Sequence, residues 1–249
     1  MSIMKRGKLG LVNRRSLALS ALERLQAASD ELETTDEPEE VEETERKKPL
    51  VKLRKEAVLA VLAESGASRV LDLGCGPGAL LLELMADRRY TEMVGADVSG
   101  VSLQIAERRL KLDRLPERQR TRIRLVQSAL TYHHDRLKGY DAAVLMEVIE
   151  HVDEVRLPAL ERAVFGHARP TTVIVTTPNV EYNVRYAGLA NEDLRHKDHR
   201  FEWTRAQFAA WTARVAEAYG YDVGIRPVGD VDPEVGSPTQ LAFFRKAAP

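Results

Sequence analysis

From residue 50 onward, the chain alternates short apolar runs with longer segments of helical pattern. Strands are predicted at residues 69–73, 92–97, 123–127, 141–146 and 172–177, with helices at 53–65, 79–86, 101–112 and 157–164. A further helix at 205–219 precedes two closing strands, 222–227 and 239–245, joined by a loop rich in Gly and Pro. Alternation of this kind predicts an α/β fold with a mostly parallel sheet. We expect seven strands, the last two forming an antiparallel hairpin at one edge.

The first 49 residues have a different composition. Residues 1–29 contain a short helical pattern, and residues 30–45 hold ten Asp or Glu and no Lys or Arg. A block of like charge repels itself and buries little surface, so it predicts a disordered linker. We therefore expect a helical stub and linker over 1–49 and one domain over 50–249. A stub of this kind suggests that a larger upstream domain was removed or is encoded in another chain.

Composition narrows the location and the class of partner. The sequence has no apolar run of about 18 residues and no apolar signal core, which predicts a protein that neither spans a membrane nor is secreted. A single cysteine, Cys75, excludes an internal disulfide and indicates a reducing, cytoplasmic setting. The net charge of −1 argues against indiscriminate binding of nucleic acid.

A glycine-rich turn follows the first strand, where residues 71–78 read LDLGCGPG. Glycines there let the backbone approach a ligand, although a bare G-x-G also occurs in dinucleotide binders. Asp72, just before the glycines, suits a cationic amine better than a pyrophosphate. Asp97 ends the next strand, where it can accept hydrogen bonds from ribose hydroxyls or simply begin a helix.

The turn resembles motif I of the class I S-adenosylmethionine-dependent methyltransferases. The resemblance implies a Rossmann-like fold and S-adenosylmethionine as cofactor, held by Asp72, Gly74, Gly76 and Asp97. It also suggests Ser128, after the third strand, near the adenine; a simple turn hydroxyl is the alternative reading.

A second cluster follows the strand at 141–146. Glu147, Glu150 and His151 stand at i, i+3 and i+4, so they would share one face if the segment were helical. Two carboxylates and an imidazole are metal ligands, although an ordinary amphipathic helix start has the same pattern. His196 and His199, in a later loop, offer a possible fourth ligand.

Three segments together resemble the Hua-enhancer-type RNA methyltransferases: E-x-x-E-H at 147–151, TPN-x-EYN at 177–183 and DHRFEWTR at 198–205. The resemblance covers roughly residues 50–246. It implies methylation of the 2′-hydroxyl at the 3′ end of RNA and, in the bacterial branch, a place in RNA repair. It also implies a divalent ion held by Glu147, Glu150, His151 and His199, the last chosen over His196 because it directly precedes Arg200.

The chemistry expected of such a site agrees with this resemblance. A divalent ion bound to the 2′- and 3′-hydroxyls would acidify a poor nucleophile and select a terminal ribose. Mixed carboxylate and imidazole ligands suit Mn²⁺ better than Mg²⁺, and either could serve. A metal-dependent methyltransferase of a small vicinal diol or catechol, and a non-catalytic RNA-binding subunit, are the alternatives.

RNA and protein partners are less strongly indicated. Residues 106–124 carry eight Lys or Arg against three acids, enough to attract phosphates, although a solvated helix face has the same pattern. Arg200, Arg205 and Trp203 are candidates to touch the terminal nucleotide, and Trp203 could equally belong to the core. In the bacterial family an N-terminal half activates a partner RNA ligase. We expect that activity to need an upstream domain that is not in this chain.

Overall fold

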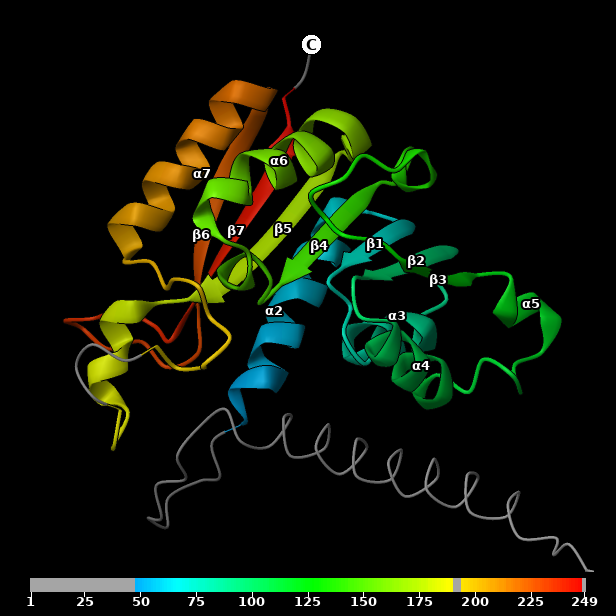
Figure 1. The fold of residues 1–249 in the computed structure, drawn as a ribbon, viewed down its shortest axis with the longest axis horizontal. Helices are drawn as coiled ribbons and strands as arrows, with labels where there is room; N and C mark the ends of the chain where they lie inside the picture. Colours follow the sequence, from blue (N-terminus) through cyan, green and yellow to red (C-terminus); the bar gives the residue numbers. More distant parts are fainter. Residues whose placement is uncertain (1–47, 190–193, 248–249) are drawn as a thin grey trace, which may run out of the picture. The chain divides into compact units, whose positions relative to one another are not determined.

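The protein is described here from a computed structural model, which describes residues 48–189 and 194–247. It contains a seven-stranded sheet of order β3-β2-β1-β4-β5-β7-β6 (Figure 1). The strands are β1 (Arg69–Leu73), β2 (Glu92–Asp97), β3 (Ile123–Gln127), β4 (Ala142–Met146), β5 (Thr172–Pro178), β6 (Tyr221–Val228) and β7 (Thr239–Lys246). The first five are parallel, and β7 pairs antiparallel with both β5 and β6. The predicted α/β fold with an antiparallel edge hairpin is confirmed.

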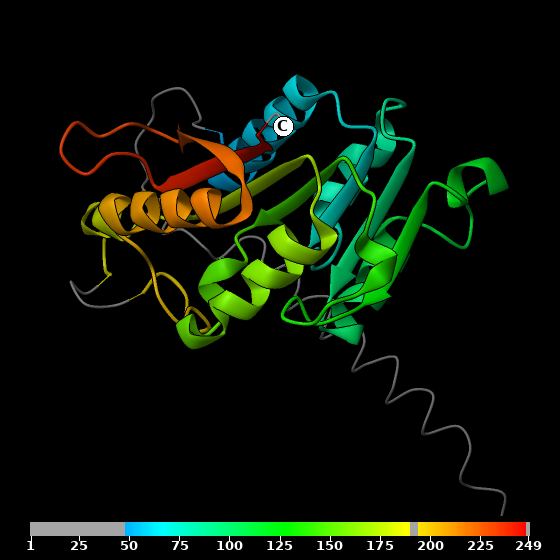
Figure 2. The same ribbon diagram turned by 90° about the horizontal axis from the view of Figure 1, so that it is seen from above.

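Helices cover both faces of this sheet (Figure 2). The main ones are α2 (Leu50–Ser65), α3 (Ala79–Ala86), α4 (Gly100–Arg109), α5 (Glu117–Arg120), α6 (Leu157–Glu161), the π-helical segment η4 (Arg162–Ala168) and α7 (Arg205–Tyr219). Short 3₁₀ turns are η1 (Asp135–Leu137), η2 (Ile149–His151), η3 (Glu154–Arg156) and η5 (Val180–Arg185). Residues of α2, α3 and α4 form one hydrophobic core with the sheet. Residues of α6, η4 and α7 form the other.

Most predicted boundaries agree with the structure to within a few residues. Helix α4 ends at Arg109 rather than at Leu112, because Lys111 adopts a left-handed conformation with φ 51°. The helix predicted at 157–164 becomes π-helical from Arg162 onward. The expectations for residues 1–47 lie outside the described residues.

The strand order determines where a ligand can bind. Strand β1 lies between β2 and β4, so the connections from β1 and β4 leave the sheet in opposite directions. In open α/β sheets ligands bind outside the carboxyl ends of the strands at such a reversal. The glycine turn after β1, Asp97 at the end of β2 and Glu147 after β4 all stand at this edge.

None of the described helices combines the length and apolar character that crossing a membrane requires.

Candidate active site

The glycine turn after β1 is shaped by positive φ angles. Gly74 has φ 80° and Gly76 has φ 49°, which glycine adopts without steric cost. The N–H of Gly74 donates to the Ala96 carbonyl at 2.7 Å, which ties the turn to β2. A Cβ on Gly74 would lie 2.6 Å from Cγ2 of Val148, the residue after Glu147. The turn after β1 and the turn after β4 are therefore in direct contact.

Asp72 is a buried carboxylate with one oxygen that lacks a hydrogen-bond donor in the described part of the chain. The residue is 3% exposed, and its Oδ2 has no hydrogen-bond partner among the described residues. Burial, and then the nearby charge of Asp97, raise the pKa of Asp72 to about 7. A cationic amine beside Oδ2 would satisfy the oxygen and restore the charged form. The residue therefore fits the role that the sequence predicted.

Asp97 holds the glycine turn by hydrogen bonds, and its carboxylate can still accept hydrogen bonds from a ligand. Its Oδ2 accepts from the N–H of Gly76 at 2.9 Å, and its Oδ1 accepts from the N–H of Ser99 at 2.8 Å. Each carboxylate oxygen has a second lone pair, which ribose hydroxyls could use. Ser128 is half-buried, and its N–H donates to the Asp97 carbonyl at 2.9 Å.

One pocket of about 680 Å³ connects the predicted cofactor residues with the predicted metal ligands. Gly74 and Asp97 line it together with Glu147 and His151. Ser128 is not among its lining residues, whereas the next three residues, Ala129, Leu130 and Thr131, are. Sequence reasoning missed these, and it also missed Val98, an apolar side chain that is 67% exposed beside Asp97.

The segment after β4 is not the α-helix that the spacing suggested. Glu147 is left-handed, with φ 54°, and residues 149–151 form the 3₁₀ turn η2. The neighbouring strand accounts for the difference: the N–H of Glu147 donates to the carbonyl and to Oγ1 of Thr176, at 3.2 and 3.0 Å. The Oγ1 of Thr176 in turn donates to Oε1 of Glu147 at 2.7 Å. Thr176 therefore fixes both the backbone and the side chain of Glu147.

Beyond this turn, Glu150, His151 and His199 converge. One ligand atom from each lies within 4.8 Å of the other two. Glu150 is 0% exposed; its Oε2 accepts from Oγ1 of Thr177 at 3.0 Å, and its Oε1 has no partner among the described residues. Burial, and then the charge of Glu147, raise the pKa of Glu150 well above its ordinary value. An orphaned carboxylate oxygen beside two imidazoles fits a divalent cation.

Hydrogen bonds set the orientation of both imidazoles. Nδ1 of His199 lies 2.6 Å from Oε1 of Glu202, and an ionised carboxylate only accepts, so Nδ1 carries the proton. Nδ1 of His151 lies 3.3 Å from the Asp198 carbonyl, which also only accepts. Both rings therefore keep Nε2 as the nitrogen with a free lone pair. Burial, and then His199, lower the pKa of His151, which favours the neutral form that binds metals.

Glu202 supports His199 from a buried position that sequence reasoning left without a role. Burial opposes its charge, yet bonds from His199 and from Asn183, whose Nδ2 lies 2.7 Å away, hold the pKa of Glu202 below its ordinary value. The Arg195 N–H donates to Glu202 at 2.7 Å as well. A carboxylate that orients a ligating histidine in this way is common behind metal sites.

The remaining predicted residues lie near the trio. Glu147 is not part of it: Oε1 accepts from Thr176, and Oε2 lies 3.1 Å from Nη2 of Arg54. The His196 ring centroid is 5.6 Å from that of His199, and its Nδ1 accepts from the Asp198 N–H at 3.2 Å.

Of the three candidates for contact with the terminal nucleotide, only one lines the pocket. Arg200 is a lining residue. Arg205 is paired with Glu181 at 2.6 Å, and Trp203 is a core residue, 7% exposed.

The comparisons with known proteins agree with this geometry. A family model described as "Methyltransferase domain" matches residues 23–223. The solved methyltransferase domain of bacterial CtHen1 is 50% identical, with a TM-score of 0.74, over 79% of this chain and 100% of that one. This chain belongs to the Hen1-type methyltransferases. It is the Hua-enhancer-type family that the motifs resembled.

Longer Hen1-type proteins match over part of their length. The chicken (Gallus gallus) small RNA 2′-O-methyltransferase is 33% identical over 208 residues, 81% of this chain and 55% of that protein. This chain thus spans about half the length of that relative. The crystal structure of the small RNA methyltransferase HEN1 is 32% identical, with a TM-score of 0.72, over 84% of this chain and 27% of that one.

The buried Asp72 predicts a pH-dependent affinity for S-adenosylmethionine. Below pH 7 the carboxyl is protonated and must lose its proton to pair with the cofactor's amine, so affinity rises with pH. Between pH 6 and 7.5 we expect the dissociation constant to fall by about tenfold, measured by calorimetry. Asp72→Asn should bind more weakly and show a flat profile. An equally flat profile in the wild type would contradict the role given to Asp72.

Arg54 is a positioning residue that the sequence did not reveal. This α2 residue is 8% exposed, and its Nε donates to Oγ1 of Thr239 at 2.9 Å while it pairs with Glu147. Arg54→Met should lower stability by up to about 3 kcal/mol, since it leaves a half-buried carboxylate unpaired. It should also lower kcat for methyl transfer more than tenfold, with an unchanged affinity for the cofactor.

Two further variants show whether the effect comes from position or from folding alone. Arg54→Lys should recover part of the kcat. The control is Arg226→Met in β6. It breaks an exposed ion pair of 2.7 Å with Glu64, which lies on α2 as Arg54 does, and it should change neither stability nor kcat measurably. Equal kcat in the Arg54→Met and Arg226→Met variants would show that Arg54 does not position the site.

Proposed function

We propose that this chain transfers the methyl group of S-adenosylmethionine to the 2′-hydroxyl of the 3′-terminal ribose of an RNA. The observation that carries the proposal is the single pocket lined by Gly74 and Asp97 at one end and by Glu147 and His151 at the other. A cofactor on the glycine turn and a substrate beside His151 would thus share one pocket. The chicken relative's name supports the same reaction.

The proposed ion site comprises Glu150, His151 and His199, with Glu147 as the fourth ligand that the resemblance implied. The turn of Glu147 allows this, since its carboxylate is held at the same pocket by Thr176 and Arg54. A divalent ion, Mn²⁺ or Mg²⁺, would bind the vicinal hydroxyls of a terminal ribose and lower the pKa of the attacking one. This donor set favours Mn²⁺.

The chain's own residues supply binding, orientation and exclusion of water. Asp97 offers acceptors to the cofactor's ribose, and Asp72 offers a carboxylate to its amine. Val148, Val152 and Leu130 give the pocket apolar walls, which would limit the water beside the methyl group. The neutral Nε2 of His151 would serve as a metal ligand, and its lone pair could accept the proton of the 2′-hydroxyl only when it is not bound to the ion.

The lining of the pocket favours RNA over a small catechol. Arg156 and Arg200 are among its lining residues, and guanidinium groups recognise phosphate. Arg200 lies 3.6 Å from Asp153 and remains 59% exposed, so it can still reach a nucleotide. A catechol carries no phosphate and would leave both arginines without a function.

We further propose a place in RNA repair and a cytoplasmic location. The 50% identity to a bacterial Hen1 domain supports the bacterial branch that the motifs resembled. A chain from a solved Pnkp1/Rnl/Hen1 RNA repair complex shares the fold at 21% identity and a TM-score of 0.59. A ligase partner would act through an upstream domain. We place the start of the methyltransferase domain near residue 50, where α2 begins, although the family match begins at residue 23.

The experiment that tests the reaction compares RNA ends. Radiolabelled methyl transfer is measured to one RNA bearing a 2′,3′-diol, a 2′-deoxy, a 3′-deoxy or a 3′-phosphate end, and to catechol. We expect transfer to the diol to exceed the rest by about a hundredfold or more, since a site built to bind two hydroxyls strongly rejects analogues that lack one. Equal transfer to the 3′-deoxy end, or faster transfer to catechol, would overturn the proposal.

A further inference from the structure

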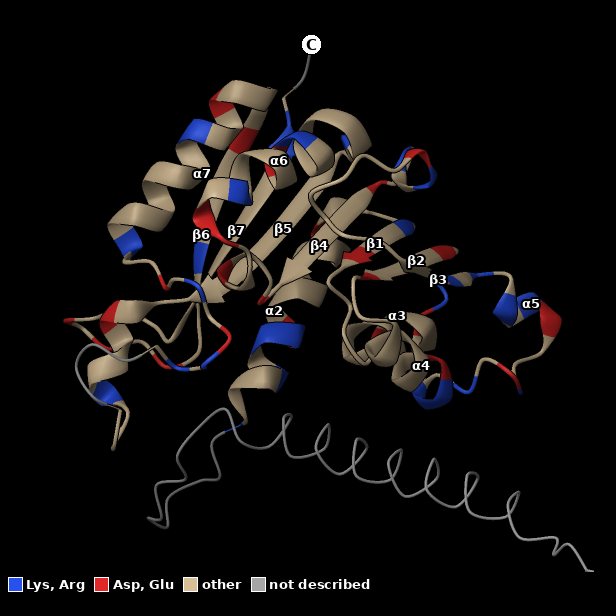
Figure 3. Cartoon of the chain, viewed as in Figure 1, with Lys and Arg blue, Asp and Glu red and all other residues tan. Residues whose placement is uncertain are grey.

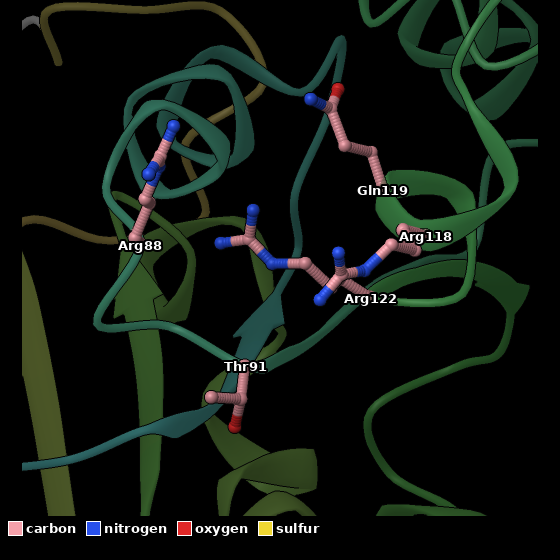
Figure 4. Close-up of a pocket in the computed structure, with 5 residues that line it drawn as sticks. All are labelled: Arg88, Thr91, Arg118, Gln119 and Arg122. Atoms are coloured by element: carbon pink, nitrogen blue, oxygen red, sulfur yellow. The ribbon is translucent and has the colours of Figure 1, made fainter.

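A second pocket lies at the amino ends of the strands, opposite the carboxyl ends where the active site lies. Its volume is about 510 Å³, and it is lined by Arg88, Thr91, Arg118, Gln119 and Arg122. Thr91 and Arg122 directly precede β2 and β3, whereas the active site follows the carboxyl ends of strands. Figure 4 shows the lining side chains coming from two sides, the segment that enters β2 and the segment of α5 that leads into β3.

The pocket is strongly positive. Three of its five lining residues are arginines, and none is an acid. The neighbouring acid Asp87 is engaged elsewhere, because its Oδ2 accepts from Nε and Nη2 of Arg89 at 2.8 and 2.6 Å. Figure 3 shows further basic residues in α5 and in the segments on either side of it, along with acidic residues at one end of α5.

The arginines differ in how they are held. Arg122 is anchored: its Nε donates to the Tyr90 carbonyl at 3.0 Å, and its Nη2 donates to the carbonyls of Asp87 and Tyr90. These acceptors are neutral, so the guanidinium of Arg122 keeps its positive charge, although the Asp87 carboxylate lies close enough to interact with it. Arg88 and Arg118 are exposed, and neither has an ion pair among the described residues. One fixed and two free guanidiniums, with a hydroxyl and an amide beside them, are groups that bind a phosphate.

We propose that this pocket binds a backbone phosphate of the RNA substrate, several nucleotides from the end that is methylated. The inference rests on the proposed function for the identity of the polyanion. The six residues of β2 separate the two edges by roughly 20 Å at about 3.3 Å per residue. One phosphate per ~3.4 Å of a helical strand makes that distance about six nucleotides. A long RNA can therefore reach both sites, and a very short one cannot.

The experiment measures RNA binding by fluorescence anisotropy with RNAs of about 4 and 20 nucleotides, both with diol ends. The test variant is Arg88→Ala with Arg118→Ala, which spares the anchored Arg122. The control is Arg136→Ala with Arg162→Ala, which removes equal charge from two exposed arginines outside the pocket. For the long RNA, the test variant should bind about tenfold more weakly than the wild type and the control. Its slope of log affinity against log salt should be shallower by about 0.7 to 0.9, from the loss of one phosphate contact.

The short RNA separates this site from the active site. The test variant should bind it with wild-type affinity and methylate it at the wild-type rate. An equal loss for both RNA lengths, or an equal loss in the control, would overturn the proposal. Unchanged affinity for the long RNA would also overturn it, and would favour a protein as the occupant of the pocket. Failure of the wild type to methylate either RNA would instead count against the proposed function, because the binding comparison does not depend on transfer.

Discussion

Burying a carboxylate without a full set of donors is costly, and the structure does so at Glu150 beside two imidazoles. One oxygen is satisfied by Thr177, and the other faces no donor among the described residues. Such a carboxylate can lose its buried charge by taking up a proton, or the charge can be balanced by a bound cation. The neighbouring residues are arranged in a way that suits a cation. Glu202 and the Asp198 carbonyl turn the Nε2 atoms of His199 and His151 toward lone-pair donation.

The sheet brings this cluster to the cofactor turn. Strand β5 supplies Thr176 and Thr177, which fix Glu147 and Glu150 respectively, and β4 carries the two glutamates into the crevice. Val148 packs so close to Gly74 that a side chain at position 74 would not fit. The turn after β1 therefore lies directly on the turn after β4. Proximity of two reactants is worth several kcal/mol of activation free energy. In this chain, that proximity depends on a contact between backbone and one valine.

Much of the fold was predictable because its signals are local. Strands such as β1, β4 and β5 are short apolar runs bounded by turn residues, and their predicted limits agree closely with the structure. The spacing of Glu147, Glu150 and His151 would have suited a helix, but Thr176, on a neighbouring strand, decides the backbone at Glu147. Arg54 could not be found for the same reason: nothing in α2 indicates that one of its side chains reaches Glu147.

The candidate site likewise has features that local sequence predicts and features that only distant contacts decide. Spacing marked Glu147, Glu150 and His151 as a group, and resemblance chose His199 over His196. Only the structure shows that Glu150, His151 and His199 converge while Glu147 is held by Arg54. Glu202 stood in a recognised motif, but its role depends on a buried contact with His199. Ser128 was assigned by its position after β3, whereas the residues that line the pocket are the three that follow it.

We propose that Glu150, His151 and His199 bind one divalent ion. Electron paramagnetic resonance of Mn²⁺ tests it most directly, because the signal of free Mn²⁺ falls as the ion binds and no catalysis is needed. We expect one bound Mn²⁺ per chain in the wild type and in His196→Ala. We expect affinity at least about ten- to a hundredfold weaker in His199→Ala and in His151→Ala. Equal binding by all four proteins, or none by the wild type, would contradict this proposal.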